Sequence, residues 1–426
     1  MHALLKEFFA HILFPYDIFV PSCIIVSKSD PKRKQLIKAD IVVVGAGPGG
    51  VMAAQRLAKK GVKIALLEKN TVPWLKTCGD LVTREGLEAL ARSGLGEWTA
   101  QFKLVDRLRF TSPDGQVLDV FLGEKPVARM IPRFQMDELL VKEAVRCGVS
   151  FMEDTRVCGV TMTDKGVRVS AKGAEVHAQM VILADGSHAP ITRSLGLLKE
   201  QVDLIAVRQY LAGDSDPAGP LEFHFQEQII PGYTWMFPIG NGQVNVGAGT
   251  YFRRTHSKEV DLRAWLEKFK AQHPIQADRL AKMEPVGPMR GHPLHTHLGV
   301  TQTHAERVLV VGDAAGLVGP FTGEGIAAAL CSGERAADTA WDALQAGDFS
   351  SDRLAPYTRA LEERYKADQR AARILRASLK TPALLNRFIG NLCQDEEMAR
   401  TFGLVYVDEL PPRLLLRPGN VLRALT

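Results

Sequence analysis

Apolar positions follow their clearest pattern between residues 39 and 70. Ile41 to Val44 is a continuous run of β-branched residues with the length of a buried strand, and residues 51–60 have the composition and spacing of a helix packed on a sheet. A second apolar run then ends at Glu68. This order of patterns predicts a strand, a turn, a helix and a second strand.

Beyond this unit, helical and strand-like stretches follow one another. Residues 83–91 and 134–146 have helical patterns, whereas apolar and polar positions alternate in 104–110 and 117–122, on either side of an SPDG sequence. Alternation on both sides of a turn sequence predicts a hairpin. Short strands then lead up to Val181 to Ala184.

The pattern changes between residues 202 and 290. Strand-like runs rich in aromatic residues dominate this stretch, which predicts a second, mainly antiparallel sheet with one helix. The predicted strands are 206–211, 221–226, 233–238 and 243–250, and the predicted helix is 262–270.

A buried parallel-strand pattern returns at Val308 to Val311, and a glycine-rich turn and a small-residue helix at 323–339 follow it. The first domain is therefore expected to be discontinuous in sequence. From Ser351 the tail begins as a charged helix and ends in leucines and prolines, which we expect to close over the second sheet.

The composition is that of an ordinary globular protein, with 426 residues of which 46% are hydrophobic and 24% charged. The net charge of +5 comes from dispersed basic residues, which argues against nucleic-acid binding and is compatible with contact with an anionic membrane surface. The six cysteines form no CxxC pair and are too few for a disulfide framework. We therefore expect a cytoplasmic protein, with peripheral membrane contact.

Residues 1–38 are expected to form an N-terminal extension. Its apolar part, residues 4–26, contains Pro15, Pro21 and charged residues, so it is a poor membrane span, and it lacks the features of a signal peptide. A short amphipathic helix here would lie on a membrane or on the protein's own surface. The alternative is a non-native start ahead of the first domain.

The turn after the first strand carries the first chemical signal. Gly45, Gly47 and Gly50 have the GxGxxG spacing, which allows a tight turn, the approach of a pyrophosphate and close helix packing. Glu68 ends the second strand, where a carboxylate can accept hydrogen bonds from ribose hydroxyls. The glycines alone also suit a plain turn, but strand, helix and acid together predict bound FAD or NAD.

Two further glycine–acid pairs follow predicted strands, at Asp185-Gly186 and Gly312-Asp313. Each places a carboxylate at the carboxyl edge of the sheet, where it can bind ribityl or ribose hydroxyls. The alternative role of both aspartates is helix capping. The helix after Gly323 points its N-terminal N–H groups at the position where a reduced isoalloxazine accumulates negative charge.

The motifs occur in the order GAGPGG, LLEKN, KTCGD, LADGS and VVGDAAGLVGPFTGEGIAAAL. In this order the chain resembles the FAD-dependent geranylgeranyl reductase family, within the p-hydroxybenzoate-hydroxylase-like flavoproteins. The resemblance covers residues 39–340. Its more specific parts are KTCGD at 76–80, the SPDG hairpin, and PGYTWMFP at 231–238 followed by NVG at 245–247.

Pattern and resemblance together imply an α/β fold, in which a Rossmann-like FAD-binding domain carries an inserted, mainly antiparallel β-sheet substrate domain and a C-terminal helical region. We expect the FAD-binding domain in residues 39–103, 128–200 and 295–350, the substrate domain in 104–127 and 201–294, and the helical region in 351–426.

The same motifs give a set of expected FAD-binding positions. Arg133 and Cys78 belong to it through the resemblance, because relatives place an arginine before the long helix and a cysteine close to the flavin. The full set is Gly45, Gly47, Pro48, Gly49, Gly50, Glu68, Lys69, Cys78, Gly79, Arg133, Asp185, Gly186, Gly312, Asp313, Gly323, Gly325 and Ile326.

The activity that the resemblance implies is an oxidoreductase reaction, the saturation of C=C bonds in isoprenoid chains of lipids or quinones. An isolated trisubstituted alkene has no carbonyl to polarise it, so its reduction needs a hydride from the flavin and a proton in a water-poor tunnel. Tyr233, Trp235 and Phe237 alternate on one strand face and are expected to line that tunnel. Cys78 is expected to gate the site or donate the proton. The alternatives are ordinary sheet core for the aromatic residues and an inert buried thiol.

No second GxGxxG unit with its strand and helix occurs, so we expect NAD(P)H to dock transiently or a reduced ferredoxin to supply electrons. Two other activities on this scaffold stay open: a flavin-dependent monooxygenase or halogenase, and a quinone-linked electron-transfer flavoprotein. YTWMFP differs from the WxWxIP pattern of halogenases, and the chain has no cysteine cluster for an iron–sulfur centre. Both observations favour the reductase.

A run of histidines suggests a metal site, but no carboxylate or cysteine has matching spacing, so we expect loop or surface histidines and no bound metal. The histidines are His292, His295, His297 and His304. The cysteines other than Cys78 are expected to be buried and inert; they are Cys23, Cys147, Cys158, Cys331 and Cys393.

Overall fold

The computed structural model describes residues 35–124, 127–199, 204–251 and 260–425. The amphipathic stretch expected at 4–26 and Cys23 lie outside the described residues. Within the described ranges, no helix has both the length and the apolar character needed to cross a membrane.

A mostly parallel six-stranded sheet is built around the first predicted unit. Three of its strands, with the sequences IVVV, IALL and MVIL, are buried along their whole length, which explains why their sequences are continuous apolar runs. Every neighbouring pair of strands is parallel except one pair at the edge of the sheet, which is antiparallel and comes first in the order given next. The strand order is β19 (His304–Ala305), β20 (Val308–Val310), β13 (Met180–Leu183), β2 (Ile41–Val44), β3 (Ile64–Leu67) and β9 (Ser150–Met152).

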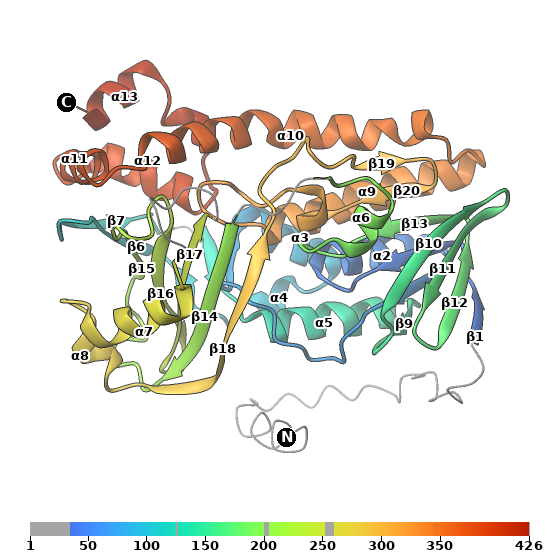
Figure 1. Cartoon of the computed structure of the whole chain (residues 1–426), viewed down its shortest axis with the longest axis horizontal. Coiled ribbons are helices and arrows are strands. Elements are labelled where there is room, and N and C mark those ends of the chain that lie inside the picture. Colours follow the sequence, from blue (N-terminus) through green and yellow to red (C-terminus); the bar gives the residue numbers. More distant parts are fainter. Residues whose placement is uncertain (1–34, 125–126, 200–203, 252–259, 426) are drawn as a thin grey trace.

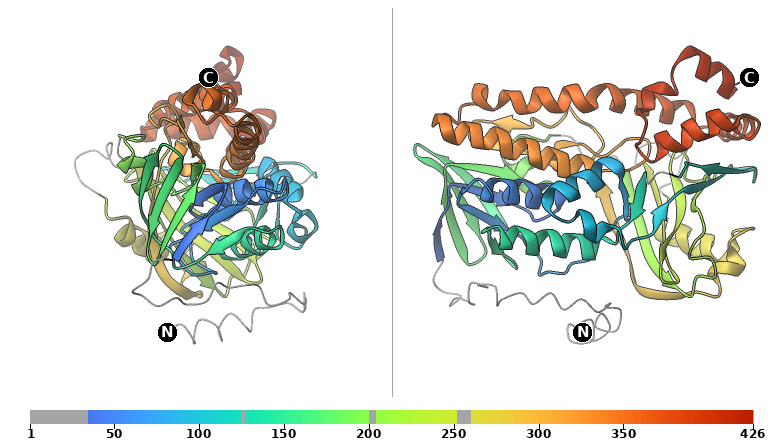
Figure 2. Two further views of the ribbon diagram at one scale, coloured as in Figure 1. Left: turned by 90° about the vertical axis from the view of Figure 1, so that its right-hand side faces the viewer. Right: turned by 180° about the vertical axis from the view of Figure 1, so that it is seen from behind.

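Helices with small or apolar faces pack around this sheet. Helix α2 contacts both α5 and α9, and the long helix α10 lies along α9, so that two layers of helix cover one side of the molecule (Figures 1 and 2). The bounds are α2 (Pro48–Ala58), α3 (Arg84–Ser93), α4 (Gly96–Thr99), α5 (Arg133–Arg146), α6 (Pro190–Ser194), α9 (Ile326–Ala346) and α10 (Ser351–Ser378).

A seven-stranded sheet occupies the other end of the molecule (Figure 1). It is antiparallel apart from the β15–β6 pair. The strand order is β18 (Glu284–Leu294), β14 (Leu204–Ala212), β17 (Gln243–Tyr251), β16 (Tyr233–Gly240), β15 (Leu221–His224), β6 (Arg107–Thr111) and β7 (Val117–Phe121).

Two separate apolar cores hold helices on this sheet. One core joins it to α7 (Leu262–Gln272) and α8 (Ala277–Leu280). The other is rich in aromatic rings and joins it to α11 (Pro382–Leu392), α12 (Glu396–Tyr406) and α13 (Pro418–Leu425). The tail therefore closes over the second sheet, as its apolar end predicted.

Two smaller sheets complete the described strands. A four-stranded sheet has the order β1 (Gln35–Lys38), β12 (Ala174–Ala178), β11 (Gly166–Ala171) and β10 (Val157–Thr163). A three-stranded sheet consists of β4 (Leu81–Thr83), β8 (Ala128–Met130) and β5 (Leu104–Val105).

Several expected elements differ in the structure. The pattern missed strand β18, because an edge strand tolerates the three prolines of EPVGPMRGHPL and shows no clear alternation. Residues 104–110 are not one strand, since 104–105 join the three-stranded sheet. Helix α9 begins at Ile326 rather than at Gly323, because Gly323 has a left-handed φ of +77°. The expectation of buried thiols is confirmed for Cys331 and wrong for Cys158 and Cys393, which are exposed, and Cys147 is only half-buried.

Candidate functional site

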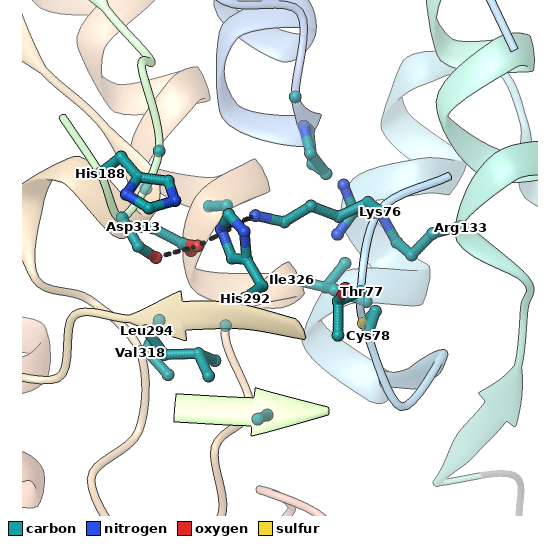
Figure 3. Close-up of a pocket in the computed structure, with 18 of the residues that line it drawn as sticks. Lys76, Thr77, Cys78, Arg133, His188, His292, Leu294, Asp313, Val318 and Ile326 are labelled. Atoms are coloured by element: carbon teal, nitrogen blue, oxygen red, sulfur yellow. Dashed lines mark hydrogen bonds and ion pairs between the residues drawn. The ribbon is translucent and has the colours of Figure 1, made fainter. Parts of the chain in front are cut away.

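A cavity of about 1080 Å³ lies between the two large sheets (Figure 3). Residues at the carboxyl ends of β2, β3, β13 and β20 line one side, and residues of β15 and β16 line the other. All the expected FAD-binding positions and the aromatic residues of β16 line this one cavity. The carboxyl ends of parallel strands are where open α/β sheets bind their ligands.

The glycine turn has the geometry that a pyrophosphate requires. Gly45 has a φ of +100°, and a Cβ on Gly50 would lie 2.0 Å from the Gly45 carbonyl oxygen, so close packing forces glycine there. In contrast, a Cβ on Gly47 would meet nothing within 4 Å. The open space beside Gly47, at the uncapped N-terminus of α2, fits a phosphate group.

Glu68 is held rigidly at the end of β3. Its Oε2 accepts a hydrogen bond from the Ala46 N–H at 3.0 Å, and its Oε1 accepts from both N–H donors of Asn70, at 3.0 Å from the backbone and 2.7 Å from the side chain. A carboxylate oxygen accepts more than one hydrogen bond. The carboxylate can therefore also accept from ribose hydroxyls in the cavity, which it lines beside the exposed Lys69.

The two strand-end aspartates are arranged differently. Asp185 caps α6, because its carboxylate accepts from the N–H groups of Ile191 and Thr192 at 2.8 and 3.1 Å, so the capping alternative describes this side chain. Burial raises its pKa. Asp313 instead accepts from the Ser187 hydroxyl at 2.9 Å and faces the cavity.

The N-terminus of α9 points into the cavity at Gly325 and Ile326. The preceding Glu324 accepts from the Ala327 N–H at 2.9 Å. Burial, followed by the nearby Asp408, raises the pKa of Glu324 to about 8. A carboxyl that is largely neutral at pH 7 leaves the positive end of the helix dipole available to a negative group in the cavity.

The loop from Lys76 to Asp80 is fixed by a buried polar network that sequence reasoning missed. Asp80 is fully buried at a left-handed φ of +65°, and its carboxylate accepts from the Tyr210 hydroxyl at 2.6 Å, the Asn245 amide at 2.8 Å and the Arg133 backbone N–H at 3.1 Å. Burial raises the pKa of Asp80 despite these donors. The motifs KTCGD and NVG were visible in the sequence, but nothing indicated that they meet.

Asn245 connects this loop to the aromatic strand. Its amide also donates to the Cys78 carbonyl at 2.8 Å, and its Oδ1 accepts from the Trp235 indole N–H at 3.0 Å. One buried side chain thus fixes the distance between the cysteine loop and the wall of the cavity. On the other side of the loop, the fully buried Arg208 donates to the Lys76 carbonyl at 2.8 Å.

Cys78 lies in the cavity close to Arg133. Burial raises the pKa of the thiol, although the Arg133 guanidinium opposes this shift. Arg133 itself is buried and makes a bidentate ion pair with Asp137 one turn along α5, with N···O distances of 2.9 and 2.8 Å. The result is a protonated thiol beside a fixed positive charge.

Sequence reasoning also missed a second polar contact in the cavity, between the Lys76 amine and the His292 ring (Figure 3). The amine also lies 4.0 Å from Asp313, and burial lowers its pKa. Burial, with Lys76 as the next cause, lowers the pKa of His292 to about 2, so the imidazole is neutral. The His188 ring lies 5.3 Å from the His292 ring.

The expectation of loop or surface histidines is wrong for His292, which lies in β18 and lines the cavity. His295 lies in the loop after β18, as expected, but its side chain is only 1% exposed. The sequence did not indicate that His292 lines the cavity, because strand β18 was not predicted. Among the described residues, no group of three or more His, Cys, Asp or Glu side chains is arranged to hold a metal ion.

Tyr233, Trp235 and Phe237 form an aromatic wall on one face of β16, with 6.1 Å between successive ring centroids. The Tyr233 hydroxyl donates to the Thr322 carbonyl, just before α9. Phe223 and Tyr406 extend the wall. The same rings are part of the aromatic core under α11 and α12, so the residues serve both as sheet core and as cavity lining.

Comparisons with known proteins show the family of the chain. Residues 38–337 match the model of the FAD binding domain family. The chain is 29% identical to a menaquinone reductase of Mycolicibacterium smegmatis, over 84% of this chain and 93% of that protein. It is 31% identical to a digeranylgeranylglycerophospholipid reductase of Methanoculleus marisnigri, over 75% of this chain and 80% of that protein.

Solved structures share the fold. A geranylgeranyl bacteriochlorophyll reductase-like protein of Thermoplasma acidophilum superposes with a TM-score of 0.77 at 24% identity, covering 89% of this chain and 99% of that one. The myxobacterial chondrochloren halogenase gives a TM-score of 0.66 at 21% identity, over 77% and 80% of the two chains.

The glycine turn gives the first prediction. Gly47→Ala should change the free energy of unfolding of the FAD-free protein by less than about 0.5 kcal/mol, because its Cβ has room, yet weaken FAD binding at least about tenfold. The matched Gly50→Ala should destabilise the FAD-free protein by about 3 kcal/mol or more. Denaturant unfolding and a flavin titration measure both quantities. Equal stability losses in the two variants would contradict the geometry.

The Asn245 network gives the second prediction. Asn245→Leu leaves the buried Asp80 carboxylate and the Trp235 N–H with fewer partners, so it should lower the free energy of unfolding by about 2 to 4 kcal/mol. Asn386, which accepts an exposed N–H from Asp114 at 3.3 Å, is the control, and Asn386→Leu should cost less than about 1 kcal/mol. Urea unfolding measures the free energy of unfolding of both variants. Similar losses in the two variants would show that the network contributes little to stability.

The third prediction concerns the protonation of Cys78. Alkylation by iodoacetamide requires the thiolate, so its rate at Cys78 should be half-maximal at a pH above the ordinary thiol value of about 8.5. Free N-acetylcysteine, alkylated in the same buffers, is the reference thiol. Peptide mass spectrometry over a pH series measures the rate at Cys78. A lower midpoint at Cys78 than for the reference thiol would mean that Arg133 stabilises a thiolate.

Proposed function

The chain belongs to the FAD-binding domain family and, within it, to the geranylgeranyl reductases, and from this premise we propose that it saturates C=C bonds in isoprenoid chains of lipids or quinones. The observation that carries the proposal is the cavity itself. It joins a dinucleotide cradle to a buried aromatic wall, with a protonated thiol between charged groups at the junction. The relatives named above reduce a quinone and a prenylated lipid, and both substrates carry isoprenoid chains.

We further propose that the six-stranded sheet and its helices bind the cofactor and that the seven-stranded sheet holds the substrate. Bound FAD would supply the hydride from its reduced ring. Gly45, Gly47 and Gly50 would hold the pyrophosphate, and Glu68 the adenosine ribose. At the other end, the N-terminus of α9 would stabilise the negative charge of the reduced ring.

The chain's own groups supply the remaining requirements of alkene reduction. Tyr233, Trp235 and Phe237 exclude water from the cavity wall, which favours an apolar chain and protects the reduced cofactor. Cys78 keeps its proton because its thiol is buried, and so it can hold a proton close to the reacting carbon. Arg133 would balance the charge that forms when the proton leaves.

The reductant is proposed to be NAD(P)H docked transiently at the cavity, or a reduced ferredoxin. The opening of the cavity carries the exposed cations Lys69, Arg156, Arg263 and Arg290. Such a rim suits an anionic donor of either kind. We also propose peripheral contact with a membrane, since the substrates of this reaction reside there.

The fourth prediction is a change in product mass. The FAD-loaded protein, reduced with dithionite, should raise the mass of a geranylgeranyl lipid or of menaquinone by about two mass units per saturated bond, as mass spectrometry would show. Cys78→Ser should lower turnover at least about tenfold with its FAD content intact, whereas Cys158→Ser should not. Equal turnover in both variants would remove Cys78 from the mechanism.

The halogenase structures make an oxygen-dependent reaction the second candidate. Oxygen consumption by the reduced protein, measured with substrate present, separates the two reactions. A hydroxylated or halogenated product that forms with oxygen uptake, and no gain of mass under anaerobic conditions, would replace the reductase by the oxygenase.

A further inference from the structure

The C-terminal helices carry a stretch of unusual charge. Residues 369–394 contain no Asp or Glu, although about one residue in nine of the whole chain is acidic. The same stretch contains five basic residues, which are Arg370, Arg373, Arg376, Lys380 and Arg387. It covers the last turns of α10 and the whole of α11, which Figure 1 places over the end of the seven-stranded sheet.

The outer surface of this stretch combines free cations with exposed apolar side chains. Arg370, Lys380 and Arg387 are exposed, and no carboxylate in the described part of the chain lies within 4.0 Å of their charged groups. Ile374 is 48% exposed and Leu384 is 43% exposed. We call these five residues the basic–apolar face. Single exposed apolar residues are common, and here they lie in a stretch that carries cations and no acidic residue of its own.

A small apolar cavity adjoins the same stretch. Arg376, Leu379 and Leu385 line this second cavity, which has a volume of about 10 Å³. Its other walls include Pro231 and Phe321, which also line the large cavity. The two cavities therefore share part of a wall, and we call the small cavity with the side chains around it the passage.

The passage is closed by side chains rather than by backbone. The Arg376 guanidinium packs over the Tyr251 ring at 3.9 Å, and Leu379 and Leu385 fill the remaining space. A volume of about 10 Å³ is about that of one water molecule, so a prenyl chain could pass only after these side chains rotate. Rotamer changes of the half-buried Arg376 and Leu379 need no unfolding of the backbone.

We propose that the basic–apolar face docks on the surface of an anionic lipid bilayer, and that a prenyl chain enters the large cavity through the passage beneath it. The inference rests on the proposed function, because that function places the substrate in a membrane. Cations near an anionic leaflet each contribute about 1 kcal/mol of binding, and Ile374 and Leu384 suit the boundary between headgroups and acyl chains. A face with an excess of positive charge fits this partner better than it fits a second copy of itself, because like charges repel.

The test uses the full-length, FAD-loaded protein and flotation with phosphatidylcholine vesicles, with and without phosphatidylglycerol. Reversing two charges in K380E/R387E should weaken binding to the anionic vesicles at least about tenfold. The control K63E/K165E makes the same change of net charge at exposed lysines away from the face, and it should bind like the unmodified protein. Leu384→Asn, which removes an apolar side chain without adding charge, should weaken binding without changing the response to phosphatidylglycerol.

Turnover separates this proposal from the proposed function. With substrate dispersed in neutral detergent, K380E/R387E should match the unmodified protein, and with substrate in anionic vesicles it should be slower. If the unmodified protein shows no turnover even in detergent, the proposed function fails, while the flotation result still decides the docking surface. Undiminished vesicle binding by K380E/R387E overturns the docking proposal. If this variant instead changes only its oligomeric state, the face is an interface between copies of the chain.

Discussion

The structure depends on one buried carboxylate, that of Asp80, at the point where the two large sheets meet. A fully buried charge is strongly unfavourable unless hydrogen bonds satisfy it, so Tyr210, Asn245 and the Arg133 backbone must all be in place together. They belong to β14, β17 and the start of α5. Satisfying this single group therefore fixes the seven-stranded sheet relative to the nucleotide-binding sheet.

The consequence for function is a rigid junction between cofactor and substrate. Asn245 reaches from Asp80 to the Cys78 carbonyl and to the Trp235 indole, so the thiol loop and the aromatic wall cannot move independently. Hydride transfer to an unactivated alkene needs the reacting atoms in close, fixed contact without water. The network supplies that fixed geometry through Asn245, which joins the loop to the wall.

Local motifs made part of this predictable from the sequence. The positions of the glycine turn and of Glu68 follow from their spacing within one βαβ unit, and continuous apolar runs predict the buried strands. The Asp80 network could not be predicted, because Tyr210 and Asn245 lie 130 and 165 residues away and no local pattern pairs them. Strand β18 and the Lys76–His292 contact were missed for a related reason, since an edge strand with prolines carries little periodicity. The Asp185 carboxylate caps helix α6, which was the alternative role expected for this residue from the sequence.

A reduced flavin held in this cavity is proposed to pass its hydride to an isoprenoid double bond. The most direct test is the absorbance of the oxidised flavin after the reduced, FAD-loaded protein is mixed anaerobically with a geranylgeranyl lipid. The oxidised spectrum should return with the unsaturated lipid and should not return with its fully saturated counterpart. A spectrum that returns only when oxygen is admitted, whichever lipid is present, would rule out this hydride transfer.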